Sequence, residues 1–110
     1  MKNSILVLLT LLFSINAKAN FAECEATLFQ HGSLSAPVAT NYCSINSTPE
    51  FYTCDRALAQ NGGLYPLEAA DACLKNSAKP DFAECEVTMV QHGGYRGLRA
   101  VAVCGIMSEK

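Results

Sequence analysis

The sequence predicts an all-α protein of three tandem α-hairpins, six short helices in all, stacked side by side as a short solenoid-like array. The cysteines form three pairs that each enclose eighteen residues, and the pairs recur about every thirty positions. Aligned on the first cysteine of each pair, the units also share a phenylalanine, a glutamine, a glycine and an alanine. Such periodicity is typical of a repeated supersecondary unit. The pairs are Cys24 and Cys43, Cys54 and Cys73, and Cys85 and Cys104.

Residues 1–19 have the features of a signal peptide. Lys2 supplies a basic start, residues 5–15 are apolar, and Ala17-Lys18-Ala19 is a small-x-small cleavage site. The apolar stretch is too short for a membrane span. We therefore expect cleavage near Ala19 and export to the periplasm or the extracellular space. The mature chain is then one disulfide-rich α-hairpin repeat domain, residues 20–110, with units at 20–46, 47–77 and 78–110.

The mature chain is acidic. Without Lys2 and Lys18 it carries six basic and ten acidic residues. This balance argues against nonspecific nucleic-acid binding, which depends on basic residues that neutralise phosphates. A domain of this size has a marginal hydrophobic core, and small exported domains commonly compensate with disulfides.

The first helix of each unit is predicted by apolar residues at i, i+3 and i+7, which lie on one helical face. Its start is indicated by Asn20 with Glu23 in the first unit and by Asp81 with Glu84 in the third, both with capping-box spacing. In the second unit, Thr48-Pro49 offers an N-cap followed by proline at the first helical position. The apolar faces should meet at the seams between units, led by Phe21, Phe51 and Phe82.

Each first helix should end at a glycine turn. His31-Gly32, Asn61-Gly62-Gly63 and His92-Gly93-Gly94 place glycine where a left-handed cap residue is needed. The second helices are expected to begin near Ala36, Pro66 and Gly97 and to end shortly after the second cysteine of each unit. Short polar linkers, residues 44–48 and 76–80, then join the units.

Disulfides within each unit are the simplest of the fifteen possible pairings. Both helices run back about 12 to 15 Å from the turn, at about 1.5 Å per residue, so the two sulfurs of a unit reach one level. The alternatives are metal binding and redox chemistry. Both favour close pairs such as Cys-x-x-Cys, which are absent from the sequence.

Catalytic signals are weak, and we expect neither enzymatic activity nor a cofactor or metal site. His31 and His92 stand directly before the turn glycine, where helix capping explains them better than catalysis does. The acidic pairs of the first and third units have i, i+2 spacing and point to different helix faces, so we interpret them as surface charges. These pairs are Glu23 with Glu25, and Glu84 with Glu86.

Two sets of residues are candidate partner contacts. Gln30, Gln60 and Gln91 occupy one repeat position and could form an amide ladder along the array that holds an extended peptide or glycan. The alternative is a hydrogen bond from each glutamine to the adjacent hairpin or turn.

The third unit differs from the others by its basic turn. Tyr95, Arg96 and Arg99 lie close together there, and both residue types are enriched in binding hot spots. These residues could contact an anionic or carboxylate-bearing partner. The favoured alternative is that they form the polar outer face that a terminal repeat requires.

The function indicated is that of a small exported binding or structural module whose partner is a protein, a peptide or a glycan. A secreted toxin, antimicrobial or protease inhibitor would share the size and disulfide density. A small hydrolase would need a pocket that holds a perturbed carboxylate or histidine, such as His92, Glu84 and Glu86 buried together.

Overall fold

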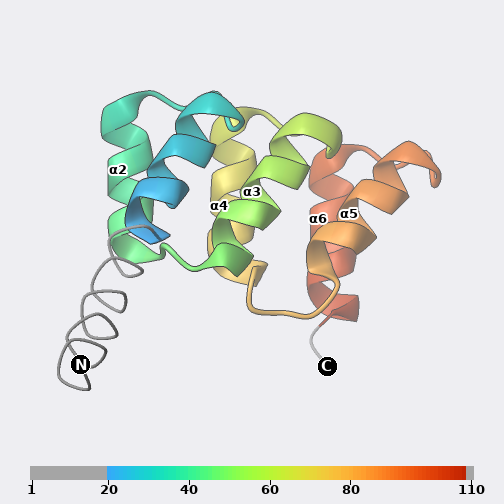
Figure 1. The fold of residues 1–110 in the computed structure, drawn as a ribbon. Coiled ribbons are helices and arrows are strands. Elements are labelled where there is room, and N and C mark those ends of the chain that lie inside the picture. The colour runs from blue at the N-terminus through green and yellow to red at the C-terminus, as the bar shows by residue number, and fades with distance from the viewer. Residues whose placement is uncertain (1–19, 109–110) are drawn as a thin grey trace, which may run out of the picture.

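The computed structural model describes residues 20–108, which form three α-hairpins arranged side by side (Figure 1). Each hairpin consists of two antiparallel helices, and the described residues contain no β-strand. The described part of the first helix covers residues 20–30. The others are α2 (Ala36–Ile45), α3 (Pro49–Asn61), α4 (Pro66–Asn76), α5 (Phe82–Gln91) and α6 (Gly97–Met107).

One disulfide ties the two helices of each hairpin. The bridges join Cys24 to Cys43, Cys54 to Cys73 and Cys85 to Cys104, with Cα–Cα distances of 5.9, 5.7 and 5.8 Å respectively. All six cysteines are therefore paired within their own unit. The predicted fold class and the predicted pairing are both confirmed.

Neighbouring units pack mainly through their first helices. The first helix of the second unit, α3, packs closely against α5, whereas α4 and α6 meet over a smaller region. Phe51 and Phe82 are buried at these seams, with exposed fractions of 0% and 1%. Between the first two units, the Tyr42 ring stacks on Phe51 and its hydroxyl donates a hydrogen bond to Asp71 in α4. Burial and this contact raise the pKa of Tyr42 to about 12.

The turns within the hairpins correct one detail of the sequence prediction. The left-handed residue is Ser33 in the first unit (φ 59°), Gly63 in the second (φ 67°) and Gly94 in the third (φ 72°). Each lies one position after Gly32 or its equivalent. In the first unit, the Leu34 amide donates to the Leu28 carbonyl, as in a Schellman motif. Gly32 therefore does not serve as the left-handed cap.

The helix starts agree with the prediction in the second unit but not in the third. The Thr48 hydroxyl accepts a hydrogen bond from the Phe51 amide, and Pro49 is the first residue of α3. Asp81, in contrast, makes no side-chain cap. Its φ of 63° is left-handed, whereas a capping side chain needs an extended backbone to reach the first-turn amides. The predicted capping box of Asp81 and Glu84 is therefore wrong.

The expected signal peptide lies outside the described residues. Across residues 20–108, none of the helices is both long and apolar enough to span a membrane.

The burial of Phe82 leads to a stability prediction. We expect Phe82→Ala to lower the free energy of unfolding by about 3 kcal/mol or more, because it leaves a cavity in a seam. Phe29→Ala is the matched control, since Phe29 is 54% exposed. Urea unfolding followed by circular dichroism measures both changes, and equal effects would contradict the proposed role of Phe82 in the core.

Candidate functional site: the seams between units and the two open ends of the array

An acidic residue follows the first cysteine of every unit: Glu25, Asp55 and Glu86. Asp55 and Glu86 are fully buried, each with an exposed fraction of 0%. None of their four carboxyl oxygens has a hydrogen-bond partner. Buried carboxylates without partners are costly, so their position at the seams needs a specific explanation.

Each buried carboxyl group lies against the turn of the preceding unit. Oδ2 of Asp55 occupies the space that a Cβ atom would take at Gly32, and Oε1 of Glu86 does the same at Gly62. A Cβ atom at either glycine would force the carboxyl group to move, and it would also meet a carbonyl of its own helix, that of Leu28 or Leu58, at 2.7 Å. The glycine therefore serves both the tight turn of its own hairpin and the close approach of the next one, and neither Gly32 nor Gly62 is the predicted left-handed cap.

Burial perturbs the ionisation of both groups. Loss of solvent raises the pKa of Asp55 from its ordinary value of 3.8 to about 7, and the pKa of Glu86 from 4.5 to about 7. A shift of one pKa unit corresponds to about 1.4 kcal/mol. Ionisation of each carboxyl therefore costs the folded state on the order of 3 kcal/mol.

This ionisation predicts an unusual pH dependence of stability. Because the folded state keeps its protons to a higher pH than the unfolded state does, the free energy of unfolding should be greatest near pH 4 and should fall as the pH rises toward 7. We expect a decrease of roughly 3 kcal/mol or more between about pH 4 and pH 8, measured by urea unfolding.

The double variant Asp55→Asn, Glu86→Gln should remove most of this slope, because neither amide ionises. Glu25→Gln is the matched control, since Glu25 holds the same unit position but remains partly exposed. Stability that rises with pH in the unmodified protein would contradict the assignment.

The turn glycines give a second test. A Cβ at Gly62 would meet Glu86 as well as the Leu58 carbonyl at 2.7 Å, whereas at Gly93 it would meet the Met89 carbonyl at 2.8 Å and no carboxyl group. We expect Gly62→Ala to cost about 1 to 3 kcal/mol more than Gly93→Ala. Thermal unfolding of the two variants measures the difference, and equal costs would show that the carboxyl contact is unimportant.

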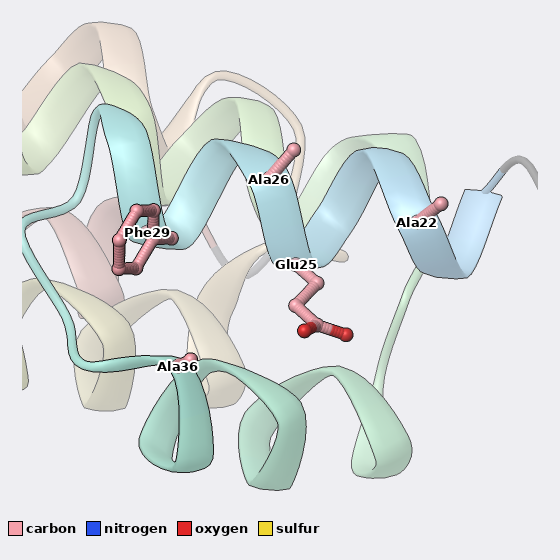
Figure 2. A pocket seen from close by; sticks show the side chains of 5 residues that line it. All are labelled: Ala22, Glu25, Ala26, Phe29 and Ala36. Carbon is pink, nitrogen blue, oxygen red and sulfur yellow. The ribbon is translucent and has the colours of Figure 1, made fainter.

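The outer face of the first unit is open and largely apolar. Ala22, Glu25, Ala26 and Phe29 lie along one face of the first helix, and with Ala36 at the start of α2 they line a pocket of about 350 Å³ (Figure 2). Among these positions, that of Glu25 corresponds to Asp55 and Glu86 in the other units. The first unit therefore presents, uncovered, the face with which the second and third units contact a neighbour.

The outer edge of the third unit is open at the complementary positions. Gly93 is exposed, whereas Gly32 and Gly62 are buried. Nothing lies within 4 Å of a Cβ placed at Gly94. Tyr95 is 40% exposed, although its equivalents in the first and second units, Leu34 and Leu64, are 5% and 8% exposed.

The predicted contact residues lie at and near this edge. Tyr95, Arg96 and Arg99 line one open pocket of about 450 Å³ together with Gly93 and Gly94. The structure thus brings the three residues together.

The three glutamines are all exposed at the same level of their hairpins. Nε2 of Gln60 donates to Nδ1 of His31 at 3.2 Å, which links the second unit to the first. For Gln60, this contact supports the structural interpretation over a ligand-binding ladder.

One prediction about the acidic residues is wrong. Glu86 is a buried seam residue and not a surface charge, whereas Glu23 and Glu84 are exposed as expected. His92 and Glu84 are exposed while Glu86 is enclosed, so the three do not form a shared buried site. Asp55 was not singled out from the sequence. The signal that could have found it is an acidic residue at the same position of all three units.

The described part of the chain holds no cluster of three or more histidine, cysteine or acidic side chains arranged to bind a metal ion. Comparisons with protein-family models, curated proteins and solved structures found no match to this chain.

Proposed function

We propose that this chain is an exported binding module that contacts a protein partner through the open outer face of its first unit. One observation carries the proposal. The first unit repeats the face that the second and third units use to contact a neighbour, and in the described residues that face is uncovered.

The composition of this face favours a protein partner over a glycan. The pocket is lined by alanines and by the ring of Phe29, which is 54% exposed, with Glu25 as its one charged residue. Exposed apolar surface of this kind is typical of protein interaction sites. Within the array, Gly32 and Gly62 allow the next hairpin to pack closely. A partner on the outer face of the first unit would need a similarly close-fitting surface, which a protein can provide.

The three disulfides support the exported setting. Disulfides persist in oxidising compartments and are rare in the cytosol. Together with the leader-like residues 1–19, they indicate a periplasmic or extracellular protein. Recovery of a chain that begins at Asn20 from those fractions would test this part of the proposal.

Photo-crosslinking in the producing cells tests the binding face. A photoreactive phenylalanine analogue at position 29 should give a discrete protein adduct, because the ring lies in the proposed contact. Position 67 is the matched control, since Leu67 is also 54% exposed but lies in α4, in the second unit of the array. Absence of an adduct at position 29, or the same adducts at both positions, would contradict the proposed face.

A further inference from the structure

The geometry points to a second copy of this chain as the partner: the outer face of the first unit of one copy docks on the open turn edge of the third unit of another, and Glu25 takes under Gly93 the place that Asp55 takes under Gly32. This inference rests on the proposed function and names the partner of the same face.

The first argument is that the molecule already contains this interface twice. At both internal seams an acidic side chain lies against a glycine that cannot bear a Cβ atom without collision. Glu25 and Gly93 are the members of this series that have no counterpart within the described residues. If two copies associate, Glu25 of one copy can lie against Gly93 of the other, so that both residues gain the contact that their equivalents make within the array.

The second argument comes from the start of the second helix in each unit. A Cβ at Gly97 would meet the carbonyls of Gly62 and Gly63 at 2.7 and 2.6 Å, so α6 begins directly on the preceding turn. Ala36 is the equivalent residue of the first unit and is exposed. Gly94, at the equivalent turn of the third unit, has open space beside it. At the first seam the equivalent residue is Pro66, which lines a pocket with Ser33 and Leu34 of the preceding turn. The start of a second helix can therefore face a preceding turn with a side chain in place, as Ala36 would.

The third argument is the apolar surface exposed at both ends. Terminal units of a stacked array require a polar outer face if the array is to stay monomeric. Here the first unit exposes Phe29, Ala22 and Ala26, and the third exposes Tyr95 and, in part, Met89. The equivalents of Met89 within the array, Leu28 and Leu58, are fully buried.

Charge adds complementarity between the two ends. Residues 20–46 contain no lysine or arginine, and their two acidic residues are Glu23 and Glu25. Arg96 and Arg99 line the open turn of the third unit beside Gly93. The third unit also carries Asp81 and Glu84, which line a separate pocket with Met89, so the complementarity is confined to the turn. There, Glu25 would meet the two arginines, which favours this pairing over contact between two identical acidic faces.

The contact is heterologous, because it joins two different surfaces. After each copy binds, the assembly still has one free outer face and one free turn edge. Association therefore continues into an open chain of copies, unless the rotation between neighbouring copies closes the chain into a ring. We therefore expect the average mass of the purified protein to rise with concentration in sedimentation velocity, without a plateau at the dimer.

Two variants each block one end. Phe29→Glu places a charge on the outer face of the first unit, and Tyr95→Glu places one on the turn edge of the third. Both side chains are well exposed, so the hairpins should fold normally, as circular dichroism can verify. Each variant alone should associate at least about tenfold more weakly than the unmodified protein. The matched control, Leu67→Glu, should associate as the unmodified protein does.

Mixing the two variants gives the decisive result. Phe29→Glu keeps an intact turn edge and Tyr95→Glu keeps an intact outer face, so an equimolar mixture should form a one-to-one dimer and nothing larger. Ala22→Glu, a change at another exposed residue of the same pocket, should give the same outcome as Phe29→Glu.

Several results would overturn the inference. Self-association of Tyr95→Glu alone would indicate contact between two identical outer faces. A protein that stays monomeric at millimolar concentration would exclude a second copy. If position 29 then still gives an adduct with a different protein in cells, the proposed binding function stands and only the identity of the partner is wrong.

Discussion

The spacing between hairpins is the constraint on which the rest of this structure depends. A disulfide fixes the two helices of a hairpin relative to one another, but it does not bring the next hairpin into place. That contact is made where the chain reverses, at Gly32 and Gly62, and the absence of a side chain there lets the following helix approach closely. The burial of Phe51 and Phe82 then follows, because the seams close around them.

The same close approach encloses two carboxyl groups that make no hydrogen bond. Replacement of a buried ionisable group by an apolar one of similar volume is often neutral or stabilising, so Asp55 and Glu86 are not explained by stability alone. They occur at both seams, and Glu25 holds the equivalent, partly exposed position of the first unit. An acidic residue at this position is therefore associated with the surface through which one unit contacts another.

Much of the fold could be predicted from the sequence because its determinants are local. The cysteine spacing, the start of α3 at Thr48 and Pro49, and the reversal after each glutamine all depend on residues a few positions apart. The burial of Glu86 could not be predicted in this way, because it depends on how one hairpin is rotated against the next. The glycines illustrate the same limit: a left-handed backbone and a close neighbour both call for glycine, and at Gly32 only the structure distinguishes the two reasons.

Each disulfide closes within a single hairpin, at a sequence separation of 19 residues, and none crosses a seam. Oxidative folding can therefore proceed module by module as the chain emerges, without waiting for distant segments. The same autonomy bears on evolution. Duplication of one module within the gene would lengthen the array by a segment that carries its own crosslink and its own matching edges, and the existing bridges would need no rearrangement.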